Sequence, residues 1–179
     1  PYTGALTVVC DPVVVAPFDL NGTPVEGITG GAIVSYTFDF LGLIPTVTQA
    51  SPILNVSNIP AGNYSVLVTA TDANGCKGSI FKLNAITVNP KPTADFTFIK
   101  SNQCGLGNVT FTGTSAVSSG TIAGYAWLIN GVNVGTTKDL TYNFTAPGTY
   151  TVDYIVATSE GCTSNTVTKQ VIFNNNNAF

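Results

Sequence analysis

The sequence predicts an all-β protein made of two tandem antiparallel β-sandwiches. The first reason is a repeat, because residues 61–76 (AGNYSVLVTATDANGC) and 147–162 (PGTYTVDYIVATSEGC) align without a gap. The second is alternation, since Tyr150, Val152 and Tyr154 would share one face of a strand. The third is composition: 44% of the 179 residues are hydrophobic and only 8% are charged. A chain so rich in β-branched and aromatic residues favours many short strands over helices.

The first module is predicted to span residues 1–89. Gly and Pro separate its apolar runs, which places a turn before and after each strand. The repeated strand lies between the turn at Gly62 and the hairpin signal DANG that ends at Gly75. Further strands are expected at 5–15 (broken by Asp11-Pro12), at 33–40, in short pieces flanked by Pro45 and Pro52, and at 80–88.

A short linker is predicted at residues 90–92, where two prolines in three positions stiffen the chain and end the ladder. The second module would span 93–173, followed by an Asn-rich linker or tail at 174–179. The missing initial Met and this polar ending suggest an internal piece of a longer or processed chain. Strands of the second module are expected at 94–99, 109–112, 122–129, 132–135, 140–144, in the repeated segment, and at 166–173.

Four aromatic residues are predicted to be structural. The segment IAGYAWLI matches the earlier IVSYTFDF, which puts Trp127 in the place of Phe38, both as core residues. Tyr64 and Tyr150 follow Gly turns, and we expect each hydroxyl to bond back to a loop as in a tyrosine corner. After this assignment the aromatics available for ligand binding are Tyr2, Phe18, Phe40 and Tyr142.

The four cysteines divide two per module, and three pairings are possible. The repeat favours two intramodule disulfides, Cys10 with Cys76 and Cys104 with Cys162. Each would close a loop of roughly 60 residues and add on the order of 4 kcal/mol. A metal site is the rival interpretation, but the thiols lack C-x-x-C spacing and the chain has no histidine. Disulfides would place the protein in an oxidising location, which is the periplasm, the cell surface or the outside of the cell; of these we expect the cell surface or the outside.

Three motifs of the second module, PTADFTF, YAW and PGTYTV, with the later GC pair, resemble the PKD (polycystic kidney disease) domain. The version with a cysteine pair found in Bacteroidetes is the most similar form. In the first module, IPAGNYSV and TDANGC resemble the SprB-type repeat of gliding-bacterium surface adhesins, whereas YTFDF resembles the PKD pattern. The resemblance implies Ig-like sandwiches in long secreted surface proteins. The usual FGDG after Trp127 is replaced by Leu-Ile-Asn-Gly, so properties tied to that motif are not implied.

Several function classes are disfavoured by the residues alone. Without histidine the chain holds no Ser-His-Asp triad and no His-ligated metal. No acidic pair recurs in both modules, and no phosphate-binding motif occurs, so we expect no enzyme activity, no cofactor and no metal. Asp72 and Asn74 are interpreted as turn residues and not as calcium ligands. A net charge of −3 disfavours nucleic acid, and no apolar run is long enough for membrane insertion.

We therefore expect a non-catalytic stalk segment of a secreted bacterial adhesin, whose repeats extend a binding tip and bear tension. Its partners would be neighbouring repeats of the same or identical chains, with surface polysaccharide or another surface protein as a further possibility. One alternative is a subunit of a self-assembling extracellular filament, since edge strands of a weakly charged chain could pair between copies. Another is a glycan- or protein-binding accessory module of a secreted enzyme.

Overall fold

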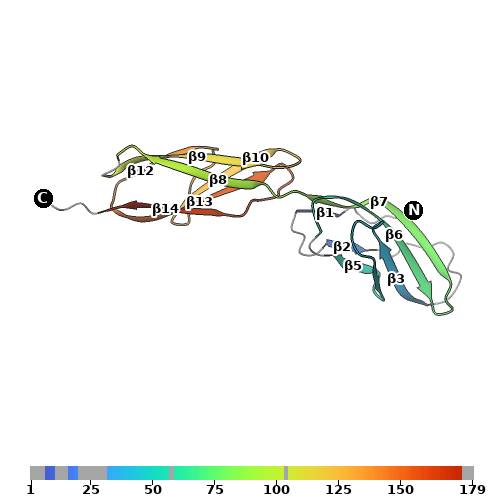
Figure 1. Cartoon of the computed structure of the whole chain (residues 1–179). Coiled ribbons are helices and arrows are strands. Elements are labelled where there is room, and N and C mark those ends of the chain that lie inside the picture. The colour runs from blue at the N-terminus through green and yellow to red at the C-terminus, as the bar shows by residue number, and fades with distance from the viewer. Residues whose placement is uncertain (1–6, 11–15, 20–31, 57–58, 103–104, 175–179) are drawn as a thin grey trace. The chain divides into compact units, whose positions relative to one another are not determined.

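The computed structural model describes residues 7–10, 16–19, 32–56, 59–102 and 105–174. Every regular element among them is a β-strand (Figure 1). The chain divides into two compact units, Pro1–Pro90 and Lys91–Phe179. Each unit is an Ig-like sandwich of its own, which confirms the predicted fold class.

The first unit contains seven described strands in two sheets. A five-stranded sheet has the order β1-β7-β6-β3-β4, and a two-stranded sheet pairs β2 with β5. The strands are β1 (Thr7–Cys10), β2 (Ala16–Asp19), β3 (Ile33–Asp39), β4 (Val47–Gln49), β5 (Ile53–Val56), β6 (Gly62–Asp72) and β7 (Lys77–Asn89).

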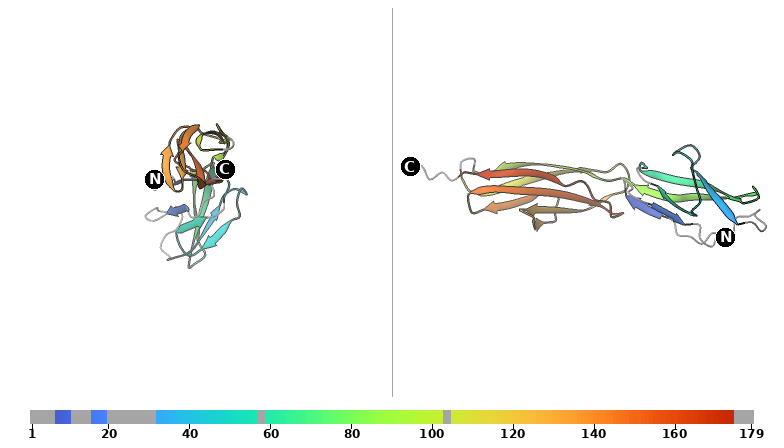
Figure 2. Two further views of the ribbon diagram at one scale, coloured as in Figure 1. Left: turned by 90° about the vertical axis from the view of Figure 1, so that its left-hand side faces the viewer. Right: turned by 90° about the horizontal axis from the view of Figure 1, so that it is seen from below.

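The second unit also has seven described strands. A four-stranded sheet, β11-β10-β13-β14, faces a three-stranded sheet, β12-β9-β8, and Figure 2 shows the strands of this unit running along its length. The strands are β8 (Thr93–Lys100), β9 (Gly107–Ala116), β10 (Ile122–Ile129), β11 (Val132–Gly135), β12 (Leu140–Phe144), β13 (Gly148–Thr158) and β14 (Val167–Phe173).

The two units share the register of their central strand pair. Phe38 of β3 lies opposite Val68 of β6, and Trp127 of β10 lies opposite Tyr154 of β13. Both pairs carry an irregularity at the start of the earlier strand, after Ile33 and after Ile122. The repeat in the sequence is therefore a repeat of strand pairing, including its bulge.

The first strands pair differently in the two units. Strand β1 is parallel to β7, with Thr7 opposite Ile86 and Cys10 opposite Asn89. Strand β8 is antiparallel to β9, with Thr93 opposite Ala116. The first sandwich thus contains one parallel pair that the expected antiparallel arrangement did not include.

Each unit has its own core, formed by the alternating inward residues of both sheets. The side chains of β6 alternate between buried and partly buried from Tyr64 to Asp72, as the period-two pattern predicts. The first core is centred on Phe38, Phe40, Leu54 and Val66, and the second on Phe96, Phe111, Trp127 and Tyr154.

Candidate functional site

The repeated hairpin turn has the same backbone geometry in both units. The amide and carbonyl of Asp72 bond with Cys76 and Gly75, and those of Thr158 bond in the same way with Cys162 and Gly161. Gly75 and Gly161 have φ of 83° and 81°, values that glycine adopts at little cost. The two turns are therefore one structural motif used twice.

The side chain at the first position of this turn stabilises it from within. The carboxylate of Asp72 accepts the backbone N–H groups of Asn74 and Cys76, both at 2.9 Å, and Asp72 is 4% exposed. In the second unit the hydroxyl of Thr158 accepts the N–H of Cys162 at 3.2 Å. Asp72 thus acts as the turn residue expected from the sequence, with its oxygen directed at backbone donors.

The cysteines do not follow the predicted intramodule pairing in the first unit. Cys10 and Cys162 are disulfide-bonded, whereas Cys76 is a free, exposed thiol. The predicted Cys10–Cys76 bond is therefore wrong. Cys10 lies opposite Asn89, the last residue of β7, while Cys76 directly precedes Lys77, the first. At the rise of an extended strand these ends are about 40 Å apart, and a disulfide requires Cα atoms within about 7 Å.

Cys104 lies outside the described residues, and so does the predicted bond between Cys104 and Cys162. Cys162 itself follows the end of β13 and is disulfide-bonded.

The four predicted structural aromatics lie in or against the two cores. Phe38 and Trp127 are fully buried, and the indole N–H of Trp127 donates to the carbonyl of Thr137 at 2.9 Å. Tyr64 is buried and Tyr150 is partly buried. Their hydroxyls donate to Pro60 and Ala146, each four residues earlier, at 2.8 and 2.9 Å, the loop hydrogen bonds expected of tyrosine corners.

The aromatic residues that the sequence left available for a ligand differ in burial from that expectation. Phe40 is fully buried in the first core, which corrects the prediction. The period-two alternation of a strand places Phe40 on the same face as Phe38, so the sequence could have predicted that Phe40 is buried. Tyr142 is partly buried, packed against the second core with its ring 4.9 Å from that of Phe144. Tyr2 and the side chain of Phe18 lie outside the described part.

Three lysine contacts connect the first and last strands of the second unit, a set we name the strand clamp. Lys91 Nζ donates to Asn165 Oδ1 at 2.9 Å, and Lys100 Nζ donates to the carbonyl of Ile172. Between them Lys169 Nζ forms an ion pair with Asp95 at 2.8 Å. These contacts advance together along both strands, so β8 and β14 run side by side in the same direction.

The middle contact of the strand clamp is also the most elaborate. Lys169 Nζ bonds to the carbonyl of Phe96 and lies 4.9 Å from the centre of its ring. The hydrogen bond from Lys169 and that from the Phe96 amide both lower the pKa of Asp95 below its ordinary value. Sequence reasoning missed these lysines because no local pattern brings position 95 next to position 169.

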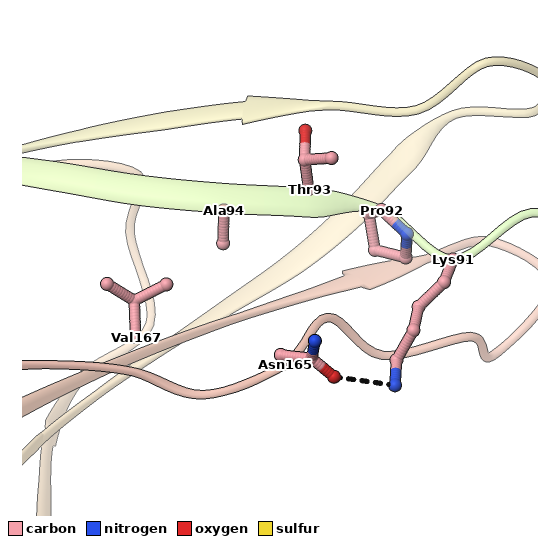
Figure 3. A pocket seen from close by; sticks show the side chains of 6 residues that line it. All are labelled: Lys91, Pro92, Thr93, Ala94, Asn165 and Val167. Atoms are coloured by element: carbon pink, nitrogen blue, oxygen red, sulfur yellow. Dashed lines mark hydrogen bonds between the residues drawn. The ribbon is translucent and has the colours of Figure 1, made fainter.

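A shallow pocket of about 290 Å³ opens where β8 and β14 begin. Figure 3 shows the side chains of Ala94 and Val167 directed toward each other, with the Lys91–Asn165 hydrogen bond at the rim. Its lining offers three polar side chains, and each already has a hydrogen-bond partner: Lys91 bonds to Asn165, and the hydroxyl of Thr93 donates to the carbonyl of Ala116. Within the described residues, no group of three or more Cys, Asp or Glu could hold a metal ion. No described helix is long and apolar enough to cross a membrane.

The fold and the repeated turn define the chain as a tandem array of Ig-like β-sandwich modules. Residues 89–173 match the family model described as "PKD domain". The second module is therefore a PKD-like domain, as the motifs of that module predicted. No curated protein matches the chain.

Among solved structures, the PKD1 domain of Vibrio anguillarum Epp is 29% identical, with a TM-score of 0.41, and the match covers 48% of this chain and 95% of that one. The PKD1 domain of the Vibrio cholerae metalloprotease PrtV is 28% identical, with a TM-score of 0.41 and coverage of 47% and 98%. Fibronectin(III)-like modules of Clostridium thermocellum CbhA are 17% identical, with a TM-score of 0.43 and coverage of 96% and 90%.

Proposed function

We propose that the chain is a non-catalytic, load-bearing segment of a secreted bacterial surface adhesin, in which tandem sandwiches hold a binding tip away from the cell. PKD domains occur in extracellular proteins, and a disulfide suits an extracellular location. The SprB-type motifs IPAGNYSV and TDANGC of the first module support the adhesin part of the proposal and an origin in Bacteroidetes.

The observation that carries the mechanical part is the arrangement of first and last strands. In the second unit the chain enters at the start of β8 and leaves at the end of β14. Because the strand clamp shows that these strands run side by side in the same direction, tension between the two ends slides one along the other. All contacts of the clamp are then loaded together in shear, instead of being opened one at a time.

The first unit uses backbone hydrogen bonds for the same purpose. Strands β1 and β7 are parallel over four residue pairs, from Thr7–Ile86 to Cys10–Asn89. Pulling Thr7 and Asn89 apart loads this ladder along the strands as well. The intramodule disulfide expected to limit extension of this unit is absent, so the ladder itself would carry the load.

Single-molecule force spectroscopy of the whole chain tests the proposal. We expect two unfolding events, and we expect Lys169→Met to lower the unfolding force of one of them. Lys138→Met is the matched control, because Lys138 is an exposed lysine of the β11–β12 loop and the substitution removes the same charge. Unfolding at forces no higher than for an unzipped hairpin, or equal effects of both variants, would contradict the load-bearing role.

The alternatives have less support among the described residues. A glycan-binding accessory module needs a cluster of exposed aromatic rings, but Phe40 is buried and Tyr142 is partly buried. The filament alternative gains one observation, the free thiol of Cys76.

A further inference from the structure

Two sheet edges of the second unit lie on the same side of its sandwich. Among the described strands, β8 ends the three-stranded sheet and β14 ends the four-stranded sheet, and the strand clamp shows that the two strands lie side by side. The edge of a sheet presents a row of backbone N–H and C=O groups that can pair with a strand of another chain. The side chains that bond to these groups therefore decide whether another chain can add there.

On β8 the backbone groups of Phe96 are both occupied by side chains. Its N–H donates to the carboxylate of Asp95 at 2.8 Å, and its carbonyl accepts a hydrogen bond from Lys169 Nζ. Because the N–H and C=O of one residue in an antiparallel strand point to the same side, both groups of Phe96 face the edge and not β9. The ion pair between Lys169 and Asp95 thus covers the edge of β8 at this residue.

On β14 the edge is covered by a lysine that comes from β8. Lys100 Nζ donates to the carbonyl of Ile172 and lies 4.5 Å from the centre of the Phe173 ring. Since this donor comes from outside the four-stranded sheet, the carbonyl of Ile172 faces the edge. The arrangement is reciprocal, because Lys169 of β14 contacts the carbonyl and the ring of Phe96 on β8.

Both lysines belong to rows of residues that otherwise face the core. Lys100 continues the row of Phe96 along β8, and Lys169 belongs to the row of Val171 and Phe173 along β14. Lysines and inward-pointing charges on edge strands are means by which β proteins prevent edge-to-edge pairing. An added strand would have to displace each ammonium group from the carbonyl to which it donates.

We propose that Lys100 closes the edge of β14 against a second copy of this chain, and that without Lys100 two copies pair through this strand. The outer row of β14 consists of Thr168, Gln170 and Ile172, which are exposed and uncharged. A two-fold axis at Gln170 places Thr168 of one copy opposite Ile172 of the other, and no like charges lie opposite each other. Such a contact uses the same surface on both copies and closes as a dimer.

The edge of β8 stays closed when its own lysine is removed. The carboxylate of Asp95 still accepts the N–H of Phe96, and without Lys169 its negative charge is no longer neutralised by the ion pair. A second copy of β8 would bring a second such carboxylate to the same sheet, and like charges oppose strand pairing. Removal of Lys100 and removal of Lys169 should therefore have different effects on association.

Sedimentation velocity of the full chain over a range of concentrations tests the proposal, with exposed thiols alkylated so that only non-covalent association is measured. Wild type, Lys169→Met and the control Lys138→Met should stay monomeric, whereas Lys100→Met should form a species of twice the monomer mass. Each substitution makes the net charge of −3 more negative, which by itself opposes association. A monomeric Lys100→Met variant, or dimers in equal amount in all three variants, would overturn the proposal.

Two further measurements distinguish strand pairing from association of a partly unfolded chain. Hydrogen exchange of the Lys100→Met dimer should show added protection at the amide of Gln170, which faces the edge because it alternates with Ile172 along β14. Gln170→Pro combined with Lys100→Met removes this donor, and edge strands accept proline on their outer side. The double variant should be monomeric, and dimers that persist in it would contradict pairing through β14.

This inference goes beyond the proposed function, and the two can fail separately. Sedimentation measures how copies associate and depends on Lys100→Met, whereas force spectroscopy measures how each module resists load and depends on Lys169→Met. A Lys100→Met variant that stays monomeric, with an intact force response to Lys169→Met, would overturn the edge proposal alone.

Discussion

Replacement of Tyr by Phe at two positions of β13 should change stability in opposite directions. Tyr154 is fully buried, and its hydroxyl has no hydrogen-bond partner among the described residues. Tyr150, four positions earlier, donates its hydroxyl to the carbonyl of Ala146. Loss of the hydroxyl therefore removes an unsatisfied polar group at Tyr154, whereas at Tyr150 it removes an existing hydrogen bond.

The magnitudes follow from these environments. A buried hydroxyl without a partner costs about 1–3 kcal/mol, so Tyr154→Phe should raise the free energy of unfolding by about 1 kcal/mol or more. Tyr150→Phe should lower it by about 0.5–1.5 kcal/mol, the net value of an ordinary hydrogen bond. For a domain of this size each kcal/mol shifts the melting temperature by about 4–8 °C.

The ionisation of Tyr154 should also make the stability of the second unit depend on pH. Burial, with smaller contributions from Tyr125 and Asp139, raises the pKa of Tyr154 to about 12. Because the pKa of Tyr154 in the folded protein lies above the ordinary value near 10, the folded state favours the neutral phenol over the phenolate. This stabilisation is full below about pH 10 and is lost as pH rises toward 12. In Tyr154→Phe that loss should disappear.

Chemical denaturation of the full chain, followed by near-ultraviolet circular dichroism, measures both variants, and spectrophotometric titration follows the phenol. The transition of the second unit has to be separated from that of the first. Equal destabilisation by the two substitutions would refute the reasoning, because it would mean that the Tyr154 hydroxyl is satisfied in the folded protein.

Further predictions concern the core, the turn and the strand clamp. Trp127→Ala should cost about 3–5 kcal/mol of unfolding free energy in denaturation experiments, because it empties the centre of the second core and leaves the carbonyl of Thr137 without its donor; a loss under 1 kcal/mol would contradict its central place. Gly113→Ala should destabilise the second unit by about 1–3 kcal/mol in melting curves, since its methyl group would lie 2.4 Å from both the Tyr154 hydroxyl and the carbonyl of Lys138; an unchanged melting temperature would refute this packing. The second unit should lose stability as pH falls below about 4, because the hydrogen bond from Lys169 lowers the pKa of Asp95 and a carboxylate with a lowered pKa in the folded state stabilises the fold only while it is ionised. Asp95→Asn should flatten this part of the profile of stability against pH, and an identical profile for both proteins would count against the ion pair.

The sequence alone determined the features that depend on local periodicity and on the repeat. Alternation located the inward face of β6 and β13, and the matching segments placed Phe38 and Trp127 at equivalent core positions. The limits of β10, β11 and β12 agree with the predicted ranges 122–129, 132–135 and 140–144, because turn residues bound each of them closely. The tyrosine hydrogen bonds were predictable because each spans only four residues.

The tertiary structure alone decided which distant residues meet. Repeat symmetry suggested Cys10 with Cys76, but the parallel pairing of β1 with the end of β7 holds them far apart. The contact of Lys169 with Asp95 exists only because the sandwich places β14 beside β8. The hydroxyl of Tyr154 lies against Gly113, which belongs to the other sheet and is 41 positions earlier in the chain. Local sequence sets the direction of each side chain, whereas strand order and sheet packing set its partners, and the order of pairing is not encoded in any one segment.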